Sequence, residues 1–136
     1  MSLPTFKVLG SFDTDRIIEE VQDYFTSKEH VSLQTNKEFL YDLAYTNSIL
    51  EQFGMFNSRL MTLRQKECYT WHRDNTPRVH LPLLTNSSCL FVLEDKAFKM
   101  PAGNVYWVDT RKPHTALNGN KGFTRHHIVG MTNELF

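Results

Sequence analysis

Apolar and polar positions follow two different periods along this chain, and the period changes near residue 59. The segment "DTDRIIEEVQDYFTSK" (residues 13–28) repeats apolar residues at helical spacing, so one stripe holds Ile17, Ile18, Val21, Tyr24 and Phe25. Asp15 lies at the positive end of the expected helix dipole and Lys28 near its negative end. Residues 13–28 are therefore expected to form a helix, preceded by a short strand at "FKVLG".

A second, shorter helix is expected in "NSILEQFG", residues 47–54. Ser48 and Glu51 stand in the spacing of a capping box, in which a hydroxyl and a carboxylate bond free N–H groups at a helix start. Gly54 would end the helix, because glycine favours the left-handed conformation found after a last turn. The pattern of residues 29–47 favours neither helix nor strand.

From Arg59 onward, short apolar runs alternate with turn residues. Eight runs follow one another: "RLMTLRQ", "CYTWH", "RVHLPLLT", "CLFVLE", "AFKM", "NVYWVD", "HTALN" and "FTRHHIVGMT". Such runs are typical of antiparallel sandwiches and barrels. We expect a mainly β fold, a cupin-like jelly roll (double-stranded β-helix) with one or two N-terminal helices packed on the outside. At 136 residues the chain fits one domain, with residues 1–58 as helical support and residues 59–136 as the core.

Composition narrows the function classes. Fifteen basic and 15 acidic side chains cancel, which leaves no electrostatic footprint for nucleic acid or an anionic membrane. No run approaches the roughly 18 apolar residues of a membrane span, and "MSLPTFKVLG" lacks the apolar core of a signal peptide. Cys68 and Cys89 form no Cys-x-x-Cys pair, so both are expected to be free, buried thiols in a reducing cytoplasm.

Polar residues inside the expected strands carry the functional signal. Side chains alternate between the two faces of a strand, so Arg78 and His80 share one face. The opposite face is apolar and consists of Val79, Leu81 and Leu83. In a jelly roll the polar face borders a cleft between the sheets. Burying polar groups costs free energy unless they are paired, so a ligand is expected in that cleft.

A candidate metal site consists of His72, Asp74 and His114. The first two form His-x-Asp at the end of an expected strand, and His114 opens a later one. Two imidazoles and one carboxylate on one side of a metal leave the other positions open, which suits non-haem Fe(II) chemistry with oxygen. The His-x-Asp pair alone is weak evidence, because a surface turn with a local hydrogen bond would give the same letters.

Arg125 follows His114 by eleven residues, on the strand after the turn "NGNKG". A hairpin returning from His114 would bring Arg125 beside the metal, where its guanidinium would hold a carboxylate through two hydrogen bonds. Alternation within "TRHHIVG" sets His127 on the same face as Arg125 and His126 on the other.

Plainer interpretations remain open for several of these residues. Arg78 would also be explained by a salt bridge with Asp109 or Glu94, and His80 by a satisfied position in the core. Trp71, Tyr106 and Trp107 are more typical of core aromatics than of substrate platforms. Arg111 would be a substrate anchor or, as is more common, a solvated loop residue. His30 and His126 are interpreted as structural or surface residues.

An ordered set of motifs resembles a known family. The set begins with His-x-Asp and Arg-x-His-x-Pro-Leu in "YTWHRDNTPRVHLPLLTN". It continues through "MPAGNVYWVDTRKPHTALNG" and ends with Arg-x-His in "TRHHIVG". Residues 59–131 thereby resemble the aspartyl/asparaginyl β-hydroxylases, a family of 2-oxoglutarate and Fe(II)-dependent oxygenases that includes free-proline hydroxylases.

The resemblance implies roles for six residues. His72, Asp74 and His114 would bind Fe(II), and Arg125 would bind the distal carboxylate of 2-oxoglutarate. Arg78 and His80 would lie near the metal-binding end of this co-substrate. The activity implied is hydroxylation of an amino acid with O2, free or as an Asp, Asn or Pro residue of a peptide or protein, with release of succinate and CO2.

Three rival functions follow from the same sequence. A cupin-like module that binds a metal or small ligand without redox chemistry would not need the carboxylate anchor at Arg125. Oxidative demethylation of nucleic acid is disfavoured by the neutral charge and the lack of a basic, aromatic-rich stretch. An interaction domain without catalysis is disfavoured by the intact set of candidate ligands. The compact chain shows no platform for a long peptide, which slightly favours a small substrate.

Overall fold

The structure, a computed structural model, describes residues 4–136. Residues 1–3, which begin the N-terminal stretch considered above, lie outside the described residues. The described chain is mainly β, with short helices near its start. Its elements are β1 (Phe6–Ser11), α1 (Thr14–Val21), a 3-10 turn (Gln22–Tyr24), β2 (Val31–Ser32), β3 (Gln34–Thr35), β4 (Glu38–Phe39), α2 (Ala44–Gln52), β5 (Phe56–Leu63), β6 (Arg78–Leu84), β7 (Cys89–Leu93), β8 (Lys96–Phe98), β9 (Asn104–Val108), β10 (His114–Asn118) and β11 (Arg125–Met131).

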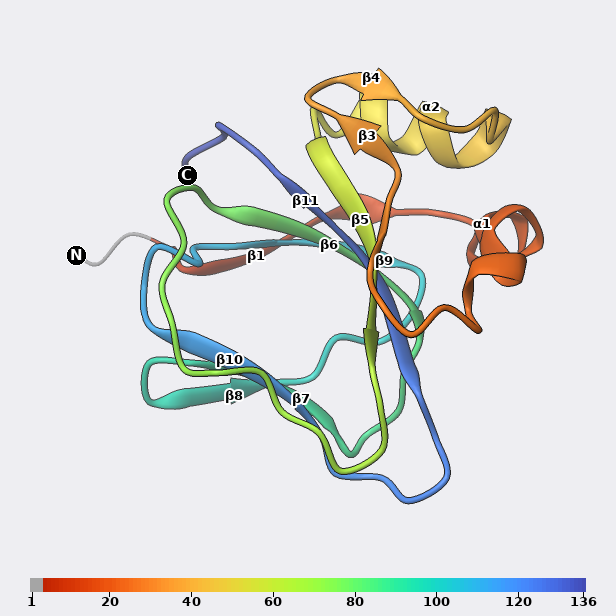
Figure 1. The fold of residues 1–136 in the computed structure, drawn as a ribbon. Helices are drawn as coiled ribbons and strands as arrows, with labels where there is room; N and C mark the ends of the chain where they lie inside the picture. Colours follow the sequence, from red (N-terminus) through yellow and green to blue (C-terminus); the bar gives the residue numbers. More distant parts are fainter. Residues whose placement is uncertain (1–3) are drawn as a thin grey trace.

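Two antiparallel sheets form the body of the protein. The larger one has six strands in the order β1-β9-β6-β11-β5-β2, and the smaller one has three in the order β10-β7-β8. The strands β3 and β4 pair separately. The smaller sheet lies below the larger one in Figure 1, with α2 above and α1 to the side. Neither helix within residues 4–136 is long and apolar enough to cross a membrane.

The alternation of side chains places an apolar cluster on each face of the six-stranded sheet. On β9, Val105 and Trp107 pack into the cluster that contains Ile17 of α1 and Leu50 of α2. The next residues, such as Tyr106, pack on the other face against residues of the small sheet. The expected helix therefore covers the outer face of the large sheet, and the other face is turned toward the smaller sheet.

Several local expectations were wrong. Residues 68–72 form no regular strand, and their pairing with β10 is limited to two isolated β-bridges, at Cys68 and at His72. The expected hairpin between β10 and β11 does not form, because β10 pairs with β7 in the small sheet while β11 lies between β6 and β5. The first helix is also shorter than residues 13–28, because it tightens into a 3-10 turn after Val21.

The start of α2 differs from the expected capping box. The helix begins at Ala44, so Ser48 lies inside it and its hydroxyl donates to the Tyr45 carbonyl. Glu20 of α1 takes the capping role: its carboxylate accepts from the N–H groups of Tyr45 and Thr46, at 2.9 and 2.7 Å, and from the Thr46 hydroxyl. Gly54, with φ of 62°, follows the end of the helix as expected.

Replacing Glu20 with alanine is expected to lower the free energy of unfolding by about 1–3 kcal/mol. The variant leaves two N–H groups and one hydroxyl at the start of α2 without their acceptor. Urea denaturation followed by circular dichroism measures the loss. The matched control is Glu19→Ala, because Glu19 is exposed on the same helix. Equal stability of the two variants would contradict the capping role.

Candidate metal centre and its pocket

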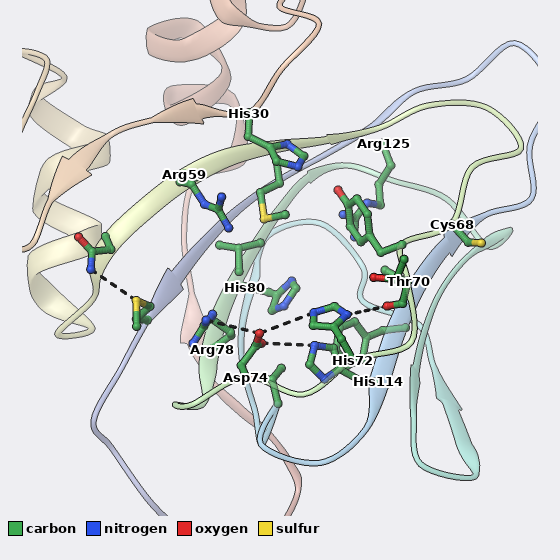
Figure 2. A pocket seen from close by; sticks show the side chains of 18 residues that line it. His30, Arg59, Cys68, Thr70, His72, Asp74, Arg78, His80, His114 and Arg125 are labelled. Carbon is green, nitrogen blue, oxygen red and sulfur yellow. Dashed lines mark hydrogen bonds and ion pairs between the residues drawn. The ribbon is translucent and has the colours of Figure 1, made fainter.

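His72, Asp74 and His114 converge at one point between the sheets. One ligand atom from each lies within 4.8 Å of the other two. His114 opens β10, and the bridge between His72 and His114 brings the preceding loop alongside that strand. Asp74 is fixed by its backbone N–H, which donates to the Thr110 carbonyl at 2.8 Å. The dashed lines in Figure 2 show both imidazoles directed at the Asp74 carboxylate.

The hydrogen bonds of the two histidines prepare their Nε2 atoms for a metal. The Nδ1 of His72 lies 2.6 Å from the Thr70 carbonyl, and the Nδ1 of His114 lies 2.9 Å from the Lys112 carbonyl. A carbonyl only accepts, so each Nδ1 carries a proton, and each Nε2 is the atom turned toward Asp74 and available to a metal. The two Nε2 atoms lie 3.6 and 3.3 Å from oxygens of Asp74. Metal-binding histidines are commonly oriented by such carbonyl bonds.

Asp74 is held as a carboxylate. Burial would raise its pKa, but the hydrogen bond with His114 and the charge of Arg78 outweigh it, so the pKa lies below the ordinary value. Arg78 lies 3.6 Å from the carboxylate and also donates to the carbonyl and hydroxyl of Thr76. A charged oxygen ligand beside two imidazoles fits a divalent transition metal.

A pocket of about 520 Å³ opens over this centre. All six residues named from the sequence line it: His72, Asp74, Arg78, His80, His114 and Arg125. Its volume lies within the roughly 300–1,000 Å³ of small-molecule sites. Arg125 enters from β11 in the large sheet, across the cleft from β10, rather than from a hairpin next to His114.

Arg125 is a buried cation without an acidic partner within residues 4–136. Its side chain is 3 % exposed, and burial lowers its pKa. The guanidinium lies 3.2 Å from the Nδ1 of His127 and 5.8 Å from the Tyr69 ring centre, and its Nε has no hydrogen-bond partner among the described residues. A buried charge without a counter-ion is costly, so this geometry is typical of a site for an anion.

The contact with Arg125 fixes the protons on two buried imidazoles. A guanidinium only donates, so the Nδ1 of His127 accepts and its proton lies on Nε2. The Nδ1 of His80 lies 3.1 Å from the same nitrogen and must therefore donate to it. His80 consequently turns an unprotonated Nε2 away from His127. His80 is thus buried and hydrogen-bonded, as the plainer interpretation had it, and it also lines the pocket.

The buried histidines predict loss of stability in acid. Burial and the charge of Arg125 lower the pKa of His80 from 6.5 to about 3, and the same causes hold the pKa of His127 well below its ordinary value. Between pH 6.5 and about 3, the unfolded chain binds more protons than the folded chain does. The free energy of unfolding that these neutral histidines contribute at neutral pH is therefore lost as the pH falls below about 6.5 toward 3. Each such histidine contributes on the order of 1.4 kcal/mol per pH unit in this window.

Urea midpoints of the metal-free protein, measured in chelator between about pH 7 and pH 5, test this prediction. The free energy of unfolding should depend less steeply on pH in a His80→Phe variant, because about one proton fewer is taken up on unfolding. A midpoint that stays constant across the window would contradict the prediction.

Three pocket residues were missed or dismissed at the sequence level. Arg59 reaches the pocket from β5, Tyr69 from the loop after it, and His30 from the segment before β2. Arg59 shares a strand face with Met61, which also lines the pocket, and this alternation is the signal that would have found it. His30, interpreted as structural or surface, came from a segment without periodicity.

Other residues lie apart from the pocket or differ from expectation. Arg111 is exposed and bonds the Asp109 carboxylate at 2.7 Å. Arg78 pairs with Asp74, and not with Asp109 or Glu94 as the plainer interpretation suggested. Tyr106 and Trp107 are core aromatics as expected, but Trp71 is 54 % exposed. Both cysteines are free, with Cys89 buried and Cys68 exposed. The ring of His126 stacks on Phe25.

Comparisons with known proteins place the chain in a family. Residues 15–129 match the sequence profile of the family described as Aspartyl/Asparaginyl beta-hydroxylase. A curated relative, L-proline cis-4-hydroxylase of Rhizobium meliloti (strain 1021), is 31% identical over 97 residues, an alignment that covers 64% of this chain and 35% of the relative. The chain thus spans about a third of the length of this relative. On the match of 15–129, the chain belongs to the aspartyl/asparaginyl β-hydroxylase family.

Proposed function

We propose that this protein is a 2-oxoglutarate and Fe(II)-dependent hydroxylase of an amino acid, with His72, Asp74 and His114 as the iron ligands. The convergence of these three side chains carries the proposal. Family membership and the proline hydroxylase relative support hydroxylation as the activity. The sandwich of a six-stranded and a three-stranded sheet supports a double-stranded β-helix of cupin type within one domain, with residues 59–136 as most of its core. The expected division at residue 59 is not sharp, because β1 and β2 from the first part of the chain belong to the larger sheet.

Each pocket residue has a distinct task in this proposal. Arg125 binds the distal carboxylate of 2-oxoglutarate, which supplies the counter-ion that its buried charge lacks among the described residues. Arg78 holds Asp74 ionised and oriented toward the two histidines, and His80 lies beside the metal-binding end of the co-substrate. Bound iron and 2-oxoglutarate would supply the oxidising chemistry that places one oxygen atom of O2 on a carbon of the substrate.

An anaerobic titration tests the proposal. Fe(II) is added to the metal-free protein, followed by 2-oxoglutarate, and the visible spectrum is recorded. A weak charge-transfer band of a keto acid chelated to ferrous iron is expected, and it should be absent in the Asp74→Ala variant. Iron binding without a band would favour the cupin-like binding module. Failure to bind iron would contradict the assignment of the three ligands.

A further inference from the structure

The pocket holds more positive than negative charge. Arg59, Arg78 and Arg125 all line it, whereas Asp74 is its one acidic residue among the described residues. A divalent metal would add to this excess. Field lines in a cleft concentrate the potential, so the pocket favours anions.

The arginines differ in what they already contact. Arg78 is paired with Asp74 and bonded to Thr76. Arg125 is buried beside His127 and is assigned to the co-substrate in the proposed function. The side chain of Arg59 makes no hydrogen bond or ion pair with any residue from 4 to 136. Arg59, which is exposed, is therefore the pocket arginine that has no partner among the described residues.

Arg59 and His30 lie together at the end of the pocket away from the metal ligands, with His80 between the two groups (Figure 2). Burial lowers the pKa of both His30 and Arg78, and the charge of Arg59 lowers both further. Arg59 is therefore close enough to each of them to affect it electrostatically. The Nδ1 of His30 accepts from the Thr62 N–H at 3.2 Å. A neutral His30 therefore carries its proton on Nε2 and has a donor to offer.

We propose that Arg59, assisted by the Nε2–H of His30, binds the free α-carboxylate of the substrate. A guanidinium presents two parallel N–H groups that match a carboxylate, and a second donor beside it fixes the orientation. The substrate is then a free amino acid rather than an internal residue of a peptide chain, which has no free α-carboxylate. This inference rests on the proposed function and adds a substrate class and two binding residues to it.

The test compares substrates with and without a free α-carboxylate. The twenty common amino acids, L-proline among them, are assayed as free acids, as α-carboxamides and as internal residues of peptides capped at both ends. Substrate-dependent succinate formation by the iron-loaded enzyme is the readout. Turnover of a free acid well above its amide is expected. An amide or capped peptide that is turned over as well as the acid would overturn the inference.

Variants assign the discrimination to Arg59. Arg59→Gln is expected to lower kcat/KM for the free acid roughly 10- to 100-fold, chiefly through KM, and to narrow the difference between the acid and its amide. Arg59→Lys should retain part of the preference, since it keeps the charge but loses the paired N–H groups. The matched control is Arg64→Gln, because Arg64 follows the same strand, bonds the Lys28 carbonyl and lies outside the pocket. Unchanged kinetics in Arg59→Gln would overturn the role of Arg59.

The anaerobic band of the iron and 2-oxoglutarate complex separates this inference from the proposed function. Arg59→Gln should form the band with wild-type affinity for 2-oxoglutarate. A wild-type band together with turnover of capped peptides alone would overturn the free-acid inference and leave the oxygenase assignment standing. Absence of the band in the wild-type protein would remove the oxygenase assignment and the substrate inference with it.

Discussion

Replacing Asp74 with alanine is expected to reduce the affinity for Fe(II) by more than about 100-fold and to abolish turnover. Removal of a residue that merely orients a ligand costs roughly 10–100-fold in metal affinity, and Asp74 is proposed as a ligand itself. Its carboxylate lies between the Nε2 atoms of His72 and His114, and its lowered pKa keeps it charged at neutral pH.

The charge of Arg78 adds to this effect. In the wild-type protein the guanidinium lies 3.6 Å from Asp74, so the two charges offset one another. The alanine variant retains the arginine without its counter-charge, and this lone positive charge repels a divalent cation. Asp74→Asn, which keeps the volume and loses the charge, should therefore bind iron almost as poorly as the alanine variant.

Calorimetric titration with Fe(II) under anaerobic conditions, paired with an assay of succinate, measures both effects. Neither variant is expected to unfold, because the loop is held by the backbone N–H of residue 74, which survives the substitution. Asp95→Ala is the control, because Asp95 is exposed in the turn between β7 and β8. Wild-type iron affinity in the Asp74 variants would contradict the metal centre.

The polar face of the site was predictable because strand alternation is a local property. Arg78 and His80 on one face of β6, with Val79 and Leu81 on the other, required only the two-residue period and appear in the structure as pocket and core. Arg125 was predicted as a pocket residue through a hairpin that does not exist. Side-chain alternation along β11 correctly predicted which face Arg125 lies on. The pairing of β11 with β5 and β6, rather than with β10, places that face toward the cleft.

The remainder depends on contacts between distant segments. Trp71 was expected in the core because it lies in an apolar, strand-like run, but that run pairs only through isolated bridges and leaves the ring exposed. His30 reaches the pocket because β2 pairs with β5, a register that no local pattern in residues 29–47 indicates. The cap of α2 by Glu20 likewise joins two helices that are separate in sequence.

Replacing Arg125 with methionine is expected to weaken 2-oxoglutarate binding while leaving iron binding intact. A charge-assisted hydrogen bond contributes about 1.5–3 kcal/mol, which corresponds to a roughly 10- to 150-fold increase in Kd. Arg125 is not among the three residues whose ligand atoms converge, so the affinity for Fe(II) alone should stay close to that of the wild type. The appearance of the charge-transfer band against 2-oxoglutarate concentration gives both quantities.

The same substitution should leave the metal-free protein as stable as the wild type or make it more stable. The guanidinium is buried, its pKa is lowered by that burial, and its Nε lacks a partner within residues 4–136, so the free protein bears the cost of desolvating a charge. Methionine fills a similar volume without that cost. Thermal unfolding with and without 2-oxoglutarate measures both effects. The Tm of the wild type should rise when the co-substrate is added, and the Tm of the variant should rise little.

Arg111→Met is the control, because Arg111 is exposed and paired with Asp109 outside the pocket. It should keep the full gain in Tm. An Arg125→Met protein that is strongly destabilised in the absence of any ligand would show that Arg125 supports the fold rather than an anion. A variant of normal stability that binds 2-oxoglutarate as tightly as the wild type would show that another residue anchors the co-substrate.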